Sequence, residues 1–246
     1  SDYSAYHGNT VAGVLAAMNT TITRVNSVFE RDMGLRFQIV PSNNRLIYIN
    51  GFNTDATPDP DPYDNYSGSQ MLSTNTGNIS GLITAAAYDI GHVFSTGGGG
   101  IAGTGPCGTN KGSGVTGIVT PEFDPFDIDY VAHEIGHQFS AGHTYYNPCF
   151  GSKVGDDYEP GSASTILGYA GICAPNVQAN SDGYFHARSI AQMTTAVNSH
   201  ACETETTYSN VEPTANAGTD YTIPRSTPFI LNGNLSSDPT VGDVLT

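Results

Sequence analysis

An eleven-residue segment from His133 to His143 carries three histidines and one glutamate in the order HEIGHQFSAGH. Residues four apart lie on the same face of a helix, so His133 and His137 can direct ring nitrogens at one metal ion. His143 lies too far along a continuing helix to share that site. We therefore predict that the helix ends near Phe139 or Ser140 and that the chain then turns back.

This set of donors is typical of a catalytic zinc site. Zinc in such sites takes three protein ligands and keeps a fourth position for water, whose pKa falls to about 7. Glu134 would accept the proton of that water as it attacks a carbonyl, and would later deliver it to the leaving amine. The segment thus predicts metal-assisted amide hydrolysis. The alternatives are a chance pattern on a polar helix face and a structural zinc, although structural sites favour closed, sulfur-rich shells.

Composition narrows the classes of protein further. The 246 residues suit one domain of moderate size plus an appendage. Eight basic residues against 23 acidic ones give a net charge of -15, which disfavours binding to nucleic acid or to an anionic membrane. The sequence has no apolar run of about 18 residues and no signal peptide at Ser1, so we expect no membrane-spanning segment and a mature, secreted chain.

The four cysteines are widely spaced and form no CxxC pair, which argues against a sulfur metal cluster. An even count in an acidic, glycine-rich chain fits two disulfides and an oxidising compartment. Spacing alone leaves three connectivities open, and buried free thiols are the alternative. The cysteines are Cys107, Cys149, Cys173 and Cys202.

Hydrophobic periodicity predicts a mixed α/β chain. The expected helices cover residues 10–31, 70–86, 130–139 and 184–200, and the expected strands 35–40, 46–49 and 88–94. Gly34 should end the first helix, and Asp127 or Asp129 should cap the zinc helix. Gly136 inside that helix suggests close packing against another backbone.

Other polar and glycine-rich stretches favour ordinary structural roles. Residues 55–64 predict a surface loop whose carboxylates are solvated, with calcium as the less favoured alternative. The glycines at 97–100 lack the lysine of a phosphate loop and indicate a flexible backbone. The histidines outside the motif are expected to be hydrogen-bonded structural residues rather than ligands; they are His7, His92, His186 and His200.

The composition changes at residue 211, where a linker-like stretch precedes two short strand patterns at 222–224 and 229–231. So short a remainder cannot complete a sandwich domain. We predict a catalytic domain over residues 1–206 and, over 207–246, a linker with an incomplete β-sandwich-like segment. That segment resembles the start of immunoglobulin-like modules of the PKD type.

The zinc segment resembles the metzincin clan of zinc endopeptidases, whose pattern is HExxHxxGxxH. Ser140 replaces the usual glycine, so we expect a left-handed backbone there or a turn passed on to Gly142. In the clan a methionine-bearing turn lies beneath the metal; residues 164–170 correspond to it, with Leu167 as the apolar floor. The resemblance to astacin-like and serralysin-like members implies that Tyr169 binds zinc or donates its hydroxyl to the oxyanion. A packed aromatic residue is the alternative.

Most of residues 1–205 resemble the reprolysin (adamalysin or ADAM-type) branch, specifically its bacterial secreted members. The resemblance implies a twisted, mostly parallel sheet with the zinc helix beneath it. An antiparallel edge strand at 100–105 would lie over the cleft, where a substrate peptide pairs as a further strand. It also implies Cys107–Cys202 and Cys149–Cys173 disulfides. Such domains open with a central strand, yet residues 1–8 show no strand pattern.

We therefore predict a secreted zinc endopeptidase with His133, His137 and His143 as ligands and Glu134 and Tyr169 as catalytic residues. Its substrates would be proteins or peptides, and the resemblance implies an inhibitory propeptide and a monomer. Calcium is a further, structural possibility. The rivals are a catalytically silent binding or adhesion domain and a structural calcium module, which the intact glutamate and the three imidazoles respectively disfavour. A serine hydrolase is poorly supported because no GxSxG elbow occurs.

Overall fold

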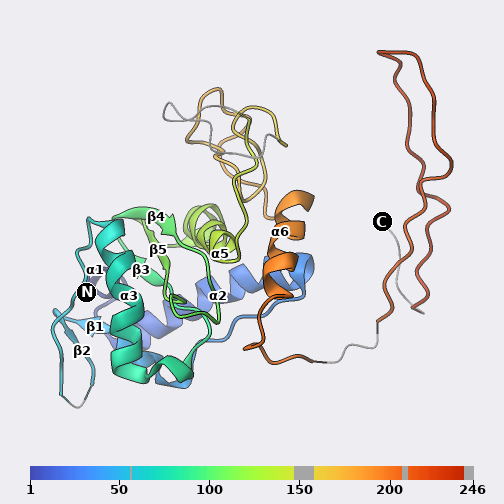
Figure 1. The fold of residues 1–246 in the computed structure, drawn as a ribbon. Coiled ribbons are helices and arrows are strands. Elements are labelled where there is room, and N and C mark those ends of the chain that lie inside the picture. Colours follow the sequence, from blue (N-terminus) through green and yellow to red (C-terminus); the bar gives the residue numbers. More distant parts are fainter. Residues whose placement is uncertain (56, 147–157, 207–209, 241–246) are drawn as a thin grey trace. The chain divides into compact units, whose positions relative to one another are not determined.

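The computed structural model describes every residue except 56, 147–157, 207–209 and 241–246 (Figure 1). It divides into two compact units, Ser1–Glu203 and Thr204–Thr246. Within the described residues, no helix has both the length and the apolar character that crossing a membrane requires.

The larger unit combines helices with two small sheets. In chain order its elements are α1 (Asp2–Tyr6), α2 (Val11–Met33), η1 (Pro41–Leu46), β1 (Tyr48–Ile49), β2 (Phe52–Asn53), α3 (Gly68–Ile83), η2 (Ala85–Ala87), β3 (Val93–Ser95), β4 (Gly99–Ala102), β5 (Gly114–Gly117), α4 (Phe123–Phe126), η3 (Asp127–Ala132), α5 (His133–Gln138) and α6 (Ala187–Val197). The α2, α3 and α6 helices confirm three of the four expected helices. Two of the expected strands survive only in part, as β1 and β3.

The boundaries of helix α2 are set by the residues at its two ends. The Thr10 side chain accepts a hydrogen bond from the Gly13 amide at 3.1 Å and so caps the first turn. Gly34 ends the helix at a φ of 64°, a left-handed conformation that is inexpensive without a Cβ. The buried face packs into the main core through Val14, Val25, Val28 and Phe29.

The main sheet has the order β3-β5-β4. Strands β3 and β5 are parallel, whereas β4 is antiparallel to β5 and forms the edge. Val93 and Val115 pack with Met71 of α3 on one face. On the other face the Phe94 ring lies 5.4 Å from that of Phe126, in the core shared with α2 and α5. The expected mixed α/β fold with an antiparallel edge strand is therefore confirmed.

The strand expected over 35–40 was wrong. Leu35, Phe37 and Ile39 are half-buried, but among the described residues no backbone hydrogen bond joins this segment to 88–94. An apolar cavity of about 140 Å³ lies between the two segments and is lined also by Met18 and Ile22. A strand requires a neighbour for its amides and carbonyls, so the hydrophobic pattern alone does not create one here. Residues 1–8 supply no strand; they form α1 instead.

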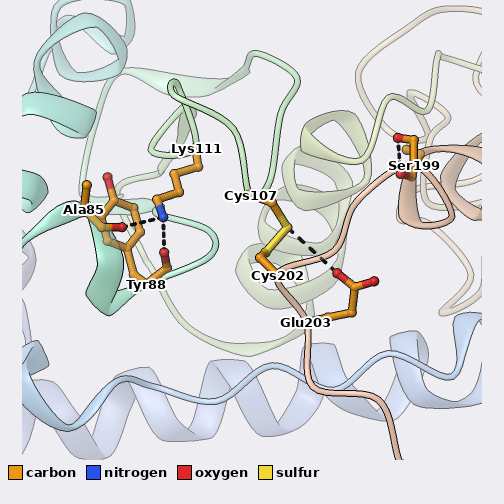
Figure 2. The surroundings of a disulfide bond; sticks show 8 residues. Ala85, Tyr88, Cys107, Lys111, Ser199, Cys202 and Glu203 are labelled. Atoms are coloured by element: carbon orange, nitrogen blue, oxygen red, sulfur yellow. Dashed lines mark hydrogen bonds between the residues drawn. A yellow bond between two sulfur atoms is a disulfide. The ribbon is translucent and has the colours of Figure 1, made fainter.

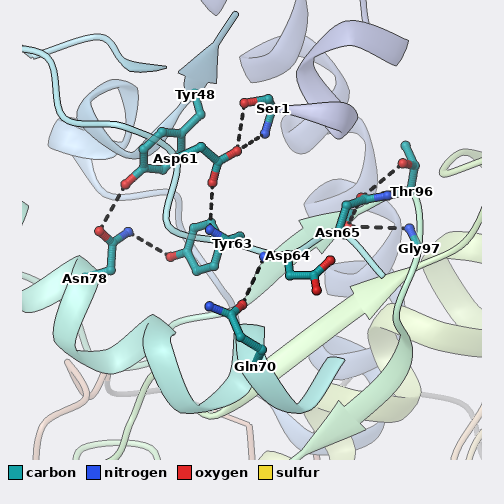
Figure 3. A network of polar contacts seen from close by, with 11 residues as sticks. Ser1, Tyr48, Asp61, Tyr63, Asp64, Asn65, Gln70, Asn78, Thr96 and Gly97 are labelled. Carbon is teal, nitrogen blue, oxygen red and sulfur yellow. Dashed lines mark hydrogen bonds and ion pairs between the residues drawn. The ribbon is translucent and has the colours of Figure 1, made fainter. Parts of the chain in front are cut away.

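In the loop at residues 55–64, the Asp61 carboxylate accepts hydrogen bonds from other groups of the protein (Figure 3). The Ser1 ammonium and hydroxyl donate to Asp61 Oδ2 at 2.5 and 2.7 Å, and the Tyr63 amide donates to Asp61 Oδ1 at 3.0 Å. Asn78 joins the hydroxyls of Tyr48 and Tyr63. Among the described residues, no group with metal-ligand geometry lies in this loop.

A disulfide joins Cys107, in the loop after β4, to Cys202, beyond α6 (Figure 2). The two Cα atoms lie 5.6 Å apart across a sequence separation of 95. This confirms one pairing implied by the resemblance; the Cys149–Cys173 pairing falls on Cys149, outside the described residues. In the same region the Lys111 ammonium donates to the carbonyl of Ala85 at 2.6 Å and to that of Tyr88 (Figure 2).

The smaller unit is mostly exposed. Thr214 and Ser237 exchange backbone hydrogen bonds of 2.8 and 3.0 Å, so its chain doubles back on itself. Neither of the strands expected at 222–224 and 229–231 forms within the described part of this unit. Its assignment to a β module, like the division at residue 206, stays a prediction.

His92 ties the sheet to helix α5. Its Nδ1 lies 2.8 Å from Gln138 Oε1 and its Nε2 lies 2.9 Å from Thr116 Oγ1. Because an amide oxygen only accepts, Nδ1 carries the proton and Nε2 accepts from the threonine. This confirms a hydrogen-bonded structural histidine, and burial lowers the pKa of His92 to about 4.

We expect His92 to make the fold sensitive to acid. The unfolded chain takes up its proton near pH 6.5 but the folded chain only near pH 4, so stability is full above 6.5 and falls as the pH drops towards 4. This pKa difference corresponds to about 3 kcal/mol in the free energy of unfolding. Urea unfolding of the wild type and of His92→Gln, both in excess chelator, should show a shallower loss in the variant between pH 7 and 4.5. Parallel losses would contradict this role.

Candidate active site

The metal-site helix is longer than the sequence predicted. Helix α4, the π-helical turn η3 and α5 run on without a break, so α5 does not begin at residue 130. The expected capping by Asp127 or Asp129 was wrong, because amides inside a continuous helix need no cap. Asp129 Oδ1 instead accepts from the Ser181 amide at 2.9 Å. A π turn directly before His133 is the kind of irregularity that often occurs at functional sites.

Helix α5 ends at Gln138 with Phe139 as its C-cap, close to the predicted end, and the chain turns at Ser140. The Ser140 φ of 68° is left-handed, as expected from its position in the motif. The Ser140 amide donates to the His137 carbonyl at 2.8 Å, and the Ala141 amide donates to that of Gly136 at 3.1 Å. These bonds satisfy the last carbonyls of the helix and direct the chain back towards His143.

The three predicted ligands meet at one point. Their Nε2 atoms lie 3.0 Å apart for His133 and His137, 3.0 Å for His137 and His143, and 3.2 Å for His133 and His143. In a tetrahedral zinc site with Zn–N distances of about 2.0–2.1 Å, neighbouring ligand atoms are separated by roughly 3.3 Å. The triangle is therefore only slightly smaller than one face of such a tetrahedron.

Two backbone carbonyls decide which nitrogens face that triangle. His133 Nδ1 lies 2.6 Å from the Ile166 carbonyl oxygen, and His137 Nδ1 lies 2.6 Å from that of Ala141. A carbonyl only accepts, so each Nδ1 carries the proton and each Nε2 presents a lone pair. Lone pairs at 3.0 Å repel one another unless a cation lies between them. The donor set thus fits a metal ion.

Burial keeps these imidazoles neutral. It is the largest cause of a lowered pKa for both His133 and His137, and the neighbouring imidazoles lower that of His133 further. Metal binding requires the neutral form, so little proton release opposes it at neutral pH.

The turn at 164–170 forms the floor of the site. Leu167 is fully buried, and a Cβ built on Gly136 would lie 2.9 Å from Leu167 Cδ2. Gly136 is therefore closely packed as expected, but against a side chain rather than a backbone. Leu167 occupies the position that the resemblance assigned to an apolar floor, one residue after the carbonyl that orients His133.

Glu134 is buried beneath the edge strand. It is 6% exposed, and burial raises its pKa to about 8; a bound cation would act in the opposite direction. A Cβ on Gly100 of β4 would overlap Glu134 Oε1 and lie 2.9 Å from Glu134 Cδ. The glycine interpreted from sequence as flexible backbone is thus what allows the strand and the carboxylate to lie against each other.

The open cleft beside the triangle has a volume of about 670 Å³. Edge strand β4 forms one side, and Asn65 holds the turn before it by accepting from the Thr96 amide and hydroxyl, both at 3.1 Å (Figure 3). On α6, Gln192 Oε1 accepts from the Gly142 amide at 3.1 Å. The cleft lining includes Gly100, Ile101, Ala102, Glu134, His137, His143, Tyr169 and Gln192.

Tyr169 lies in the cleft as predicted from its place in the turn. Its ring centroid is 4.6 Å from that of His143 and 4.6 Å from that of Tyr145, with which it is stacked. Burial, followed by the influence of Tyr145 and Glu134, raises its pKa to about 12, so the hydroxyl keeps its proton. It can act as a hydrogen-bond donor, and its catalytic role stays a prediction.

A family model described as metallo-peptidase family M12B, reprolysin-like, matches residues 15–144. The chain belongs to this reprolysin-like family. No curated protein matches it. The matched region contains all three histidines and Glu134 but ends at Thr144, so the turn beneath the reprolysin site lies beyond the match.

The sequence predicted the side chains of the site but not the groups that hold them in place. The carbonyls of Ala141 and Ile166 and the glycine at 100 carry no side-chain signal. Gln138 lies within the motif, but its contacts with His92 and with the Gly91 carbonyl at 3.0 Å depend on the folded sheet.

We expect Gly100→Ala to separate the position of Glu134 from metal binding. The added methyl group should displace the carboxylate, so kcat should fall about 100-fold while zinc content is unchanged. Zinc analysis and peptide hydrolysis measure the two effects. The control is Gly77→Ala in α3, where a Cβ meets nothing within 4 Å; it should leave activity intact. Full activity in Gly100→Ala would show that Glu134 is not held by β4.

Proposed function

We propose that this reprolysin-like protein is a secreted, zinc-dependent endopeptidase with Glu134 as its general base. The observation that carries the proposal is the convergence of the Nε2 atoms of His133, His137 and His143, within 3.2 Å of one another, beside a buried carboxylate. Such a site combines the ligands and the base that amide hydrolysis requires.

Each residue of the site has its own role in the proposed hydrolysis. Zinc, when bound by the three histidines, lowers the pKa of water and polarises the scissile carbonyl. Glu134 takes a proton from the attacking water as its oxygen bonds to the carbonyl carbon. It then delivers that proton to the amide nitrogen, so the C–N bond breaks with a neutral amine as leaving group. Tyr169 donates its hydroxyl hydrogen to the oxyanion.

Edge strand β4 supports a peptide as the substrate. Within the described part of the chain it pairs with β5 on one side and has no strand on the other, and it lies directly over Glu134. An extended peptide that adds to its other side through backbone hydrogen bonds would bring a main-chain carbonyl past the carboxylate. Backbone pairing accepts many side chains, which favours broad specificity.

Two further features support the proposal: a disulfide bears on the compartment, and the buried base bears on enzymatic activity. The Cys107–Cys202 disulfide favours an oxidising, extracellular compartment. The principal rival is a binding or adhesion domain that retains the zinc fold without activity. An intact base in a buried position beneath the cleft favours the enzyme.

Replacing Glu134 tests the mechanism. Glu134→Gln should retain zinc but lose about 10²- to 10⁴-fold in kcat, the usual contribution of a general base. Cleavage of a quenched peptide library, with metal analysis of each protein, measures this. The matched control is the exposed Glu30→Gln, which should be fully active. Chelator should abolish wild-type activity and zinc should restore it. Equal activity in the two variants would contradict the mechanism, and a zinc-loaded but inactive wild type would favour the binding domain.

The role of Tyr169 has its own test. Tyr169→Phe removes one hydroxyl and keeps the stacked ring, so kcat should fall about 10- to 100-fold with KM and zinc content unchanged. Tyr66→Phe, at an 84% exposed tyrosine, is the control. An unchanged kcat in Tyr169→Phe would leave the residue as a packed aromatic only.

A further inference from the structure

Glu159 is a buried carboxylate that lies outside both the motif and the family match. It is 8% exposed and accepts four hydrogen bonds. The hydroxyls of Thr144 and Thr165 donate to its Oε2, each at 2.5 Å. The backbone amides of Ser164 and Thr165 donate to its Oε1 at 3.1 and 3.2 Å. All four donors are neutral.

These donors belong to the two chain segments that complete the histidine triangle. Thr144 follows the third ligand, His143. Thr165 precedes Ile166, whose carbonyl accepts from the first ligand, His133. One carboxylate therefore joins the Thr144 side chain, beside the third ligand, to the turn that orients the first.

Backbone hydrogen bonds reinforce the same junction. The Glu159 amide donates to the Thr144 carbonyl at 2.9 Å, and the Thr144 amide donates to the Leu167 carbonyl at 3.2 Å. The carboxylate thus lies between two segments that already run side by side. Its own four bonds fix how far the turn lies from the chain after His143.

The chemistry of the side chain suits this task. Burial alone would raise the pKa of Glu159, but the four hydrogen bonds outweigh it and hold the pKa below its usual value. An ionised carboxylate accepts at both oxygens, and charge-assisted bonds are about twice as strong as neutral ones. A neutral side chain of the same size cannot accept from all four groups.

We propose that Glu159 is a positioning residue for the metal centre, fixing His133 and His143 at zinc-binding distance through Ile166 and Thr144. The proposal rests on the proposed function in taking zinc as the metal. It differs from a brace that only stabilises the fold, because it requires zinc affinity itself to depend on the carboxylate.

The test measures zinc affinity by competition with a chromophoric chelator, alongside thermal unfolding of the zinc-free protein. Glu159→Ala should weaken zinc binding about 10- to 100-fold, the usual effect of losing a partner that orients a ligand. Glu159→Gln should give a smaller loss, because its oxygen still accepts from the two amides while the threonine hydroxyls rotate to accept from its NH₂ group. The control is Asn75→Ala, a buried residue of α3 that donates to the Gly112 carbonyl at 2.7 Å. It should lower the unfolding temperature with zinc affinity unchanged.

Zinc affinity equal to wild type in Glu159→Ala, with only a lowered unfolding temperature, would overturn the proposal. If that variant does not fold, Thr144→Val and Thr165→Val each remove one donor and decide the question by the same measurement. Weaker zinc binding in either variant supports the positioning role, and wild-type binding in both overturns it. Because the readout is zinc affinity, it holds even if the Glu134 experiment shows that the protein does not cleave peptides.

Discussion

The hydrogen bonds from His133 and His137 to backbone carbonyls are the constraint on which the rest of the site depends. Each bond places the proton on Nδ1 and leaves an Nε2 lone pair directed at the same point. These two nitrogens lie 3.0 Å apart, and each lies 3.0–3.2 Å from His143 Nε2, so the surrounding fold must hold the three imidazoles together against repulsion. That repulsion is what a bound cation relieves, and it ties metal binding to the stability of the two segments that supply the carbonyls.

Those segments are held by different means. The Ala141 carbonyl is placed by the end of α5, where Ser140 takes the left-handed conformation that closes the last helical turn. The Ile166 carbonyl belongs to a turn that is packed through Leu167 onto Gly136 and bonded through Thr165 to Glu159. Ser140 and Leu167, the two positions that depart from the metzincin pattern described above, are thus accommodated by ordinary packing and by a backbone cost at Ser140 of about 1–2 kcal/mol.

The sequence predicted what depends on near neighbours along the chain. Helix α2, its stop at Gly34 and the turn at Ser140 follow from periodicity and backbone preference over a few residues. The strand expected over 35–40 failed because its formation depends on a partner elsewhere in the chain, which no local pattern reveals. The predicted aspartate caps failed for a related reason: the helix continued through a π turn, so no free amides remained to be capped. Glu159 gave no signal because its donors lie 5, 6 and 15 residues away and surround the carboxylate only in the fold.

Gly100 is a strand position at which β propensity favours a larger residue, but the space is needed for the Glu134 carboxylate. Glycine weakens a strand, because it loses more backbone entropy on folding and offers no side chain to pack. Here β4 is held instead by its pairing with β5 and by Asn65 at the preceding turn. Any side chain on Gly100 that pointed inwards would occupy the space of the Glu134 carboxylate. The edge strand therefore gives up intrinsic stability at the point where the carboxylate of Glu134, the proposed general base, lies against it.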